Sequence, residues 1–258
     1  MTAEQETGTS ATAHAGFSKV QVGGLSMRKA LAGLLCLMMI VVVGCGGPAG
    51  QSAVNSENQP VEPFEDKNLN LTTGKIQIKV ANPEGKGPFP VIVLLHGYSQ
   101  KVDDHYVEAM SYLAKRNFIV VAPSLSFGTM NSASYKVSEI IDQVAKWPRV
   151  KSEQMGVWGF SMGAGAALLT ADKNAKVKAV VACGAPYSEL DQSIIVPLAA
   201  PVLILHGALD DIEIAKRYEN KRKELNRPVQ VNYTEKGHSW EIEPEIAKTA
   251  DFFRDTLK

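Results

Sequence analysis

A serine flanked by glycines is the residue of this sequence best suited by type and spacing to covalent chemistry. The segment Gly159-Phe160-Ser161-Met162-Gly163 matches the pattern G-x-S-x-G. A predicted strand, Met155–Trp158, precedes it, and a small-residue helix is predicted over Gly163–Thr170. A serine at such a turn adopts a strained backbone that exposes its hydroxyl, and the glycines avoid clashes with neighbouring backbone. We therefore expect Ser161 to be a nucleophile rather than part of a purely structural turn.

Around this turn the hydrophobic pattern predicts alternating strands and helices. Strands are predicted over 75–80, 91–95, 118–122, 155–158, 177–183, 202–205 and 229–233. Helices are predicted over 104–116, 134–147, 163–170, 212–225 and 244–257. This alternation predicts an α/β fold with a mostly parallel sheet and helices on both faces. Chemistry is then expected at the carboxyl ends of the strands.

Four segments of the chain resemble the α/β-hydrolase superfamily, and most closely its dienelactone hydrolase-related branch, which includes cutinase-like and polyester-degrading esterases. They are residues 90–98 (PVIVLLHGY), 157–163 (VWGFSMG), 203–210 (LILHGALD) and 237–239 (GHS). The resemblance spans roughly residues 75–257. The sequence has no second hydrophobic alternation, so we expect a single catalytic domain, and the 18 residues 184–201 are too few for a large cap. Dienelactone hydrolases proper use a cysteine nucleophile, whereas this chain has serine, which argues against dienelactone as the substrate.

The chain has five histidines from which a general base could come. His14 lies in the leader and His105 starts a predicted helix. His96 and His206 each occur in Leu-His-Gly at a strand end, where a ring is expected to hold neighbouring loops by hydrogen bonds. His238 follows the last predicted strand and fits the Ser–Asp–His chain order of the fold, so we expect it to be the base.

Two adjacent aspartates follow the predicted strand 202–205, and either could orient the histidine. Asp210 stands at the acidic position of Gly-x-x-Asp and is preferred. Asp211, as the residue before the predicted helix 212–225, could instead cap that helix. Asp191 and Glu189 follow the preceding strand and are weaker alternatives.

An oxyanion hole requires two backbone N–H groups. We expect one from Met162, the residue after the nucleophile, and the other from Tyr98, in the loop after the predicted strand 91–95. The side chain of Tyr98 could also floor the acyl pocket. Trp240, two residues after His238, is either a second substrate contact or a packing residue.

Composition excludes several other classes of protein. The chain has 258 residues, 45% of them hydrophobic, and its 27 basic and 27 acidic residues cancel, which is ordinary for a soluble globular protein. Zero net charge gives no electrostatic case for binding nucleic acid. Three cysteines are too few for a disulfide scaffold, and none has metal-ligand spacing. We expect neither a metal nor an organic cofactor.

The N-terminal region resembles a bacterial lipoprotein signal. Met27-Arg28-Lys29 is a short basic start, and Ala30–Val43 is an apolar run too short for a permanent membrane span. Val42-Val43-Gly44-Cys45 resembles the lipoprotein cleavage site, which implies export, a lipid on Cys45 and attachment to a membrane of the cell envelope. The signal starts at Met27 rather than Met1, so residues 1–26 are interpreted as a spurious or disordered extension.

The predicted organisation is therefore an extension (1–26), a signal peptide (27–44), a flexible tether (45–68) and an α/β-hydrolase domain (69–258). The expected activity is hydrolysis of small or polymeric carboxylic esters by Ser161, His238 and Asp210, with short or flexible acyl chains favoured. A serine peptidase or thioesterase of the same fold is the enzymatic alternative. A ligand-binding lipoprotein without catalysis is the alternative from another class.

Overall fold

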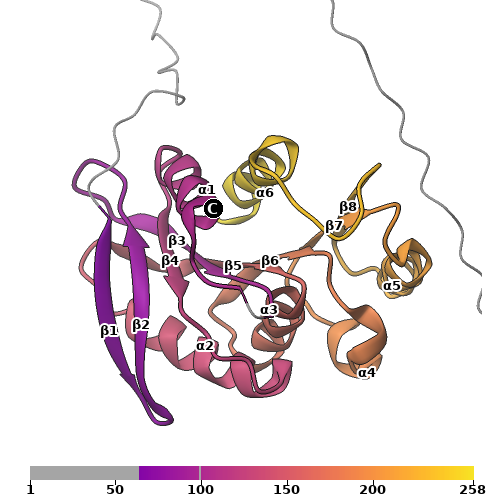
Figure 1. Cartoon of the computed structure of the whole chain (residues 1–258), viewed down its shortest axis with the longest axis horizontal. Helices are drawn as coiled ribbons and strands as arrows, with labels where there is room; N and C mark the ends of the chain where they lie inside the picture. Colours follow the sequence, from indigo (N-terminus) through magenta and orange to yellow (C-terminus); the bar gives the residue numbers. More distant parts are fainter. Residues whose placement is uncertain (1–63, 99) are drawn as a thin grey trace, which may run out of the picture. The chain divides into compact units, whose positions relative to one another are not determined.

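The computed structural model describes residues 64–98 and 100–258, which form one α/β domain. Eight strands make a single sheet in the order β1-β2-β4-β3-β5-β6-β7-β8 (Figure 1). The strands are β1 (Glu65–Leu71), β2 (Gly74–Ala81), β3 (Phe89–Leu95), β4 (Ile119–Pro123), β5 (Val150–Phe160), β6 (Val177–Cys183), β7 (Val202–Gly207) and β8 (Val229–Thr234). The hairpin of β1 and β2 is antiparallel and joins β4 antiparallel, whereas β4 to β8 pair in parallel. The predicted, mostly parallel sheet is confirmed.

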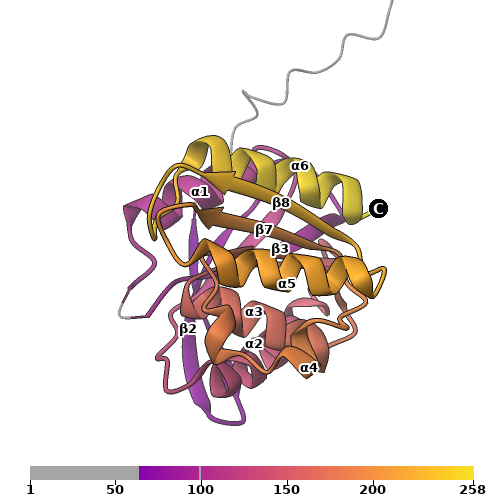
Figure 2. The same cartoon turned by 90° about the vertical axis from the view of Figure 1, so that its right-hand side faces the viewer.

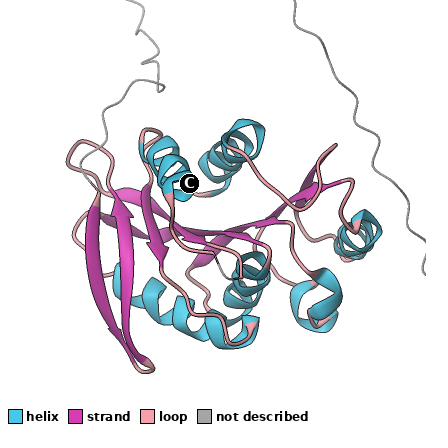
Figure 3. Ribbon diagram, in the orientation of Figure 1, coloured by secondary structure: helices cyan, strands magenta, loops and turns pink. Residues whose placement is uncertain are grey.

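Helices cover both faces of this sheet, as predicted. The helices are α1 (Asp104–Ala114), α2 (Met130–Val144), α3 (Met162–Lys173), η2 (Tyr187–Glu189), α4 (Gln192–Ile195), α5 (Ile212–Glu224), η3 (Ile242–Ile246) and α6 (Ala247–Thr256). One core cluster unites buried residues of α1 and α6 with one face of the sheet, and a second unites α2, α3, α4 and α5 with the other. The two layers lie above and below the sheet in Figures 2 and 3. No helix in the described part of the chain is long and apolar enough to cross a membrane.

The structure extends several predicted elements and adds three, β1, η2 and α4. Strand β1 begins at Glu65, inside the segment predicted as a tether. It was not predicted because its first residues are charged, and only its later leucines Leu69 and Leu71 are buried. Helix α2 begins at Met130 instead of Ser134, since Thr129 accepts a hydrogen bond from the Ser132 N–H and caps it. The last predicted helix is split, with regular α-helix only from Ala247.

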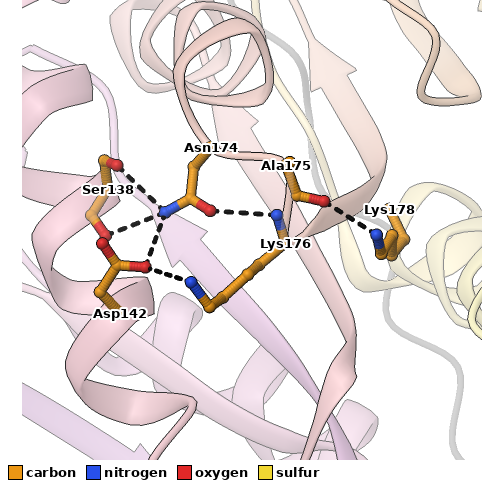
Figure 4. Close-up of polar contacts among 6 residues, drawn as sticks. All are labelled: Ser138, Asp142, Asn174, Ala175, Lys176 and Lys178. Atoms are coloured by element: carbon orange, nitrogen blue, oxygen red, sulfur yellow. Dashed lines mark hydrogen bonds and ion pairs between the residues drawn. The ribbon is translucent and has the colours of Figure 1, made fainter.

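Polar contacts fix the carboxyl end of α3 against α2 (Figure 4). The side-chain amide of Asn174 donates to the Ser138 carbonyl (3.2 Å) and hydroxyl (3.0 Å) and to Asp142 Oδ1 (3.3 Å). Lys176 Nζ donates to the same Asp142 oxygen (2.8 Å), and this hydrogen bond lowers the pKa of Asp142. The end of α3 remote from Ser161 is thereby anchored, which helps to hold its amino end in place at the carboxyl edge of the sheet.

Candidate active site

Ser161 occupies a sharp turn between β5 and α3. Its backbone has φ 54° and ψ −122°, a left-handed value that a serine adopts only when the surrounding structure enforces it. A Cβ on Gly159 would lie 2.2 Å from the carbonyl oxygen of Gly163, and one on Gly163 would lie 2.5 Å from that of His96. Both glycines are therefore required by close backbone contacts, as the motif predicts.

His238 and Asp210 meet at the ends of neighbouring strands β8 and β7. His238 Nδ1 lies 2.6 Å from Asp210 Oδ2, a short charge-assisted hydrogen bond. The histidine side chain is 46% exposed and can therefore reach a substrate, whereas that of Asp210 is 26% exposed. The Asp211 N–H donates to Asp210 Oδ1 (3.0 Å) and fixes the other carboxylate oxygen.

The remaining acidic candidates lie elsewhere. Asp211 precedes α5 but makes no side-chain capping bond to it, so the alternative of a helix cap is not what the structure shows. Asp191 accepts from the N–H of Ser193 and caps α4. Glu189 lies exposed in η2. Of the four acids, the structure brings Asp210 to the histidine.

The hydrogen bonds of Asp210 decide its charge. Burial alone would raise its pKa, but the hydrogen bonds from His238 and from the Asp211 N–H, with the charges of His238 and His206, outweigh burial and lower the pKa. The carboxylate is consequently ionised at neutral pH. It can hold the His238 ring in the tautomer with the proton on Nδ1, which leaves Nε2 free to accept a proton.

The turn after β6 contacts both the Ser161 backbone and the His238 ring. The Ser161 N–H donates to the Cys183 carbonyl (2.9 Å), and the next residue, Gly184, has φ 55°. A Cβ on Gly184 would lie 3.2 Å from His238 Cε1 and 3.3 Å from Phe160 Cε2. The rings of Phe160 and His238 also pack against each other, with centroids 4.9 Å apart. Gly184 and Phe160 are site residues that the sequence analysis did not single out, although a Gly-Ala-Pro turn after β6 was a visible signal.

The loop after β3 is held by His96. Its Nδ1 donates to the Gly97 carbonyl (2.8 Å) and its Nε2 accepts from the Leu125 N–H (3.0 Å). The Gly97 N–H is itself bonded to Gln100 Oε1 (2.9 Å). His96 therefore has the loop-holding role expected of it, and burial lowers its pKa and favours the neutral ring that this role needs.

Two backbone N–H groups near the serine remain available to a ligand. Those of Tyr98 and Met162 have no acceptor among the described residues, unlike the bonded N–H of Gly97. Met162 is the first residue of α3, where the helix dipole adds positive potential. The two groups expected to form an oxyanion hole thus lie at the loop after β3 and at the amino end of α3. The side chain of Tyr98 is 61% exposed.

Trp240 is a packing residue in this structure. It is 6% exposed and stacks on His105 with ring centroids 4.0 Å apart. Its edge contacts the rings of Tyr106 and Trp158, both at 5.0 Å. Of the two roles expected for Trp240, the structure favours packing over substrate contact, because its ring fills the core beneath the loop that carries His238.

A cavity of about 670 Å³ opens beside the loop after β3. Its walls include His96 and Tyr98 from that loop, Gln77 from β2, and the segment 124–127 after β4. Polar groups of Gln77, Gln100, Lys101, Ser124 and Ser126 share its walls with the apolar Phe127 and Leu125. This mixed lining was not predicted, because it is assembled from loops far apart in the sequence. Elsewhere in the described residues, no group of histidine, cysteine and acidic side chains could hold a metal ion.

Comparisons with known proteins place this geometry among hydrolases. Residues 50–180, just over half of the chain, match the chlorophyllase family model, and residues 130–250 match the dienelactone hydrolase family model. No curated protein matches in a sequence search.

Among solved structures, an esterase of Pyrococcus furiosus matches with 17% identity and TM-score 0.65, over 76% of this chain and 94% of its own. An esterase of Pyrobaculum calidifontis matches with 17% identity and TM-score 0.65, over 78% and 88%. Dipeptidyl peptidase 4 of Porphyromonas gingivalis matches with 16% identity and TM-score 0.63, over 77% of this chain but only 36% of its own. At these identities the likenesses establish the α/β-hydrolase fold.

Proposed function

This chain belongs to the chlorophyllase family of α/β-hydrolase-fold proteins, and from that premise we propose that it is a serine hydrolase of carboxylic esters. The observation that carries the proposal is the strained turn of Ser161 beside a histidine whose Nδ1 is 2.6 Å from an ionised carboxylate. A protein that only bound a ligand would have no use for a strained serine. The dienelactone hydrolase match and the esterase neighbours support an ester as the substrate.

In the proposed reaction, Ser161 Oγ attacks the ester carbonyl while His238 Nε2 takes its proton. The negative charge on the carbonyl oxygen is held by the N–H groups of Tyr98 and Met162, and Asp210 stabilises the His238 imidazolium. The imidazolium then protonates the leaving alcohol, which departs and leaves an ester on Ser161. Water, activated by the neutral His238, hydrolyses this acyl-enzyme and restores the serine.

The surroundings of the site favour esters with short or flexible acyl chains. The cavity beside Tyr98 is lined by polar as well as apolar side chains, and such a lining gives a long hydrocarbon chain little favourable binding free energy. Tyr98 and Leu209, exposed by 61% and 79%, lie on loops at the carboxyl edge of the sheet. Polymeric esters could then reach the serine as well as small ones.

The test is a serine-directed fluorophosphonate probe applied with p-nitrophenyl acetate as substrate. We expect the full-length protein to be labelled and to hydrolyse the ester, and Ser161→Ala to lose both properties while keeping its thermal stability. Equal labelling of wild type and Ser161→Ala, or activity of the variant within tenfold of wild type, would refute the nucleophile. Cleavage of peptide substrates in preference to esters would favour the peptidase alternative.

We also propose that the protein is exported and anchored to a cell-envelope membrane through lipid on Cys45, which lies outside the described residues. The support is the sequence order of basic start, apolar run and Val-Val-Gly-Cys. Mass spectrometry of the native N-terminus is expected to find an acylated Cys45. An unmodified N-terminus upstream of Cys45 would overturn this proposal and leave the ester hydrolase proposal untouched.

A further inference from the structure

A second histidine faces the carboxylate of Asp210. His206 lies near the end of β7, its side chain is 2% exposed, and its Nε2 is 3.7 Å from Asp210 Oδ2. The same oxygen is 2.6 Å from His238 Nδ1. Two imidazoles, one buried and one open to solvent, therefore converge on a single carboxylate oxygen.

Besides Asp210, the buried ring interacts with one other polar group in the described part of the chain, the backbone of Asp211, which acts to raise its pKa. Neither His206 Nδ1 nor Nε2 makes a hydrogen bond within normal limits, although buried nitrogen atoms are nearly always bonded. The nearby Tyr187 ring is 6.2 Å away and its hydroxyl is also buried without a partner. Asp210 Oδ2, at 3.7 Å from Nε2, is thus a charged group that can compensate for burying the imidazole.

The surrounding groups indicate which form of the ring is present. The ionisable groups facing His206 are Asp210 and Asp211 on its own loop, His238 after β8, Tyr187 in η2 and Tyr233 beside it in β8. Burial lowers the pKa of His206, and the attraction of Asp210 only partly opposes this. The ring is therefore neutral at neutral pH and carries one N–H.

The position of that single proton follows from electrostatics. With the proton on Nε2, the N–H dipole points at a carboxylate; with the proton on Nδ1, a lone pair on Nε2 would face the same negative charge. We propose that His206 is a positioning residue of the site, whose neutral Nε2–H faces Asp210 Oδ2 and keeps this carboxylate ionised and directed at His238. The inference rests on the proposed function, because it concerns the same triad. At 3.7 Å the contact is a long one, of the kind that tightens when a site becomes charged during reaction.

The sign of the effect on catalysis can be worked out. A neutral donor on Asp210 reduces the basicity of the carboxylate, so removing it makes the carboxylate hold the His238 imidazolium more strongly. The free base form of His238 then appears at higher pH. The acid limb of kcat/KM, which reports that deprotonation, should move upward in a variant without the donor.

The experiment compares two substitutions in the full-length chain, with p-nitrophenyl acetate as substrate. His206→Leu removes the donor, and His206→Gln keeps a neutral N–H near the position of Nε2. We expect His206→Leu to lower kcat about tenfold and to move the acid limb up by about half a pH unit or more, with His206→Gln close to wild type in pH profile. If both variants lose the same activity and keep the wild-type acid limb, His206 only fills space and the proposal is wrong.

A measurement on the unaltered protein keeps the inference testable if His206→Leu does not fold. Nitrogen-15 NMR of histidine-labelled protein is expected to show the Nε2–H tautomer for His206 at a pH where His238 is protonated. An Nδ1–H tautomer, or a charged His206 under those conditions, would overturn the positioning role. Neither NMR result depends on Ser161, so the positioning role of His206 can fail while the proposed function stands. Activity that survives in Ser161→Ala would instead refute the proposed function.

Discussion

Asp210 and His238 lie 28 residues apart in the sequence, and Oδ2 of the first is 2.6 Å from Nδ1 of the second. Parallel pairing of β7 with β8 produces this contact, because it sets His206 beside Tyr233 and Gly207 beside Thr234 and so brings the following loops together. A Cβ on Gly207 would lie 2.2 Å from the Gly237 carbonyl oxygen, so the two loops touch directly. Asp210 therefore orients His238 through the sheet register and through a glycine that lets the loops approach.

The neighbouring aspartates provide a matched pair for testing this contact. Asp210→Asn should lower kcat/KM by about 10²–10⁴-fold, because an amide can present its N–H to Nδ1 and stabilise the wrong tautomer of His238. Asp211→Asn should change kcat/KM less than about threefold, because its side chain does not contact the histidine and the Asp211 N–H that fixes Asp210 is retained. Initial rates on p-nitrophenyl acetate measure both. A larger loss of kcat/KM in the Asp211 variant than in the Asp210 variant would mean that Asp211, not Asp210, orients His238.

Gly184, a buried turn residue, is expected to matter for activity. In Gly184→Ala the new methyl would press on His238 Cε1 at 3.2 Å and on Phe160 Cε2 at 3.3 Å, at a backbone with φ 55°. We expect kcat/KM to fall about 10–100-fold because the histidine is displaced, and stability to fall by about 1–2 kcal/mol from the left-handed backbone.

Gly74→Ala is the control for Gly184→Ala. Gly74 also has a positive φ, 117°, but a Cβ there meets nothing within 4 Å, and the residue is the first of β2, directly after the turn from β1. This variant should lose stability from backbone strain and keep its activity. Urea unfolding and kcat/KM, measured on both variants, separate strain from displacement of His238; equal activity in the two variants would show that Gly184 does not position the ring.

The difference between these two glycines shows where sequence reasoning reaches its limit. The Ser161 turn was predictable because the backbone geometry of the turn requires glycine, serine and small residues, and these follow one another within one short segment. His238 and Asp210 were identified by chain order and motif, and their hydrogen bond then follows from strand pairing. Gly184 and Phe160 contact His238 only after β5, β6 and β8 are assembled, so the Gly-Ala-Pro turn that begins at Gly184 signals a turn but not this contact. The burial of Trp240 could not be predicted from the neighbouring sequence either, since it depends on packing against His105, which lies far away in the sequence.

Strand β1 was missed for a related reason. Its first three residues are all charged and do not alternate with apolar residues. Their strand conformation comes from antiparallel pairing with β2, which sets Glu65 opposite Val80 and Leu71 opposite Gly74. By contrast, β6 was predicted with both ends correct, because it is buried along nearly its whole length and reads as an apolar run interrupted only by Lys178.

Glu219 should make the stability of the domain depend on pH. The carboxylate accepts hydrogen bonds from Lys223 and from the Tyr233 hydroxyl (2.7 Å), linking α5 to β8. Burial would raise the pKa of Glu219, but these two hydrogen bonds outweigh burial and lower it below the ordinary glutamate value of 4.5. A carboxylate with a lowered pKa contributes stability that is fully present above its unfolded-state pKa and is lost as pH falls through its folded-state pKa.

The substitution Glu219→Gln isolates this contribution. The variant should unfold about 1–2 kcal/mol more easily than wild type at pH 7, since a neutral amide accepts weaker hydrogen bonds. The difference should shrink as pH is lowered below 4.5. Chemical denaturation at several pH values measures it, and a difference that stays constant down to the acid range would mean that the charge of Glu219 contributes nothing.

The final prediction concerns acyl chain length, and it depends on the connection between β6 and β7. This segment, Gly184 to Pro201, has only 18 residues and contains the short helices η2 and α4. The buried guanidinium of Arg222 in α5 donates to the carbonyls of Ile195, Val196, Leu198 and Ala200 at 3.0–3.3 Å. The connection is thereby fastened to α5 and is not free to close over the site.

Where no lid covers the site, as in the described part of the chain, an added methylene gains little once the acyl chain leaves the cleft. An enclosed tunnel would instead yield about 0.8 kcal/mol, roughly fourfold in kcat/KM, for each buried CH₂. We therefore expect kcat/KM on p-nitrophenyl esters of increasing chain length to level off or fall after a few carbons. Adding detergent micelles or emulsified substrate should not activate the enzyme, because residues 64–98 and 100–258 form no cover to displace. A steady rise to long-chain esters, together with activation at a lipid surface, would contradict the open site and indicate a lipase.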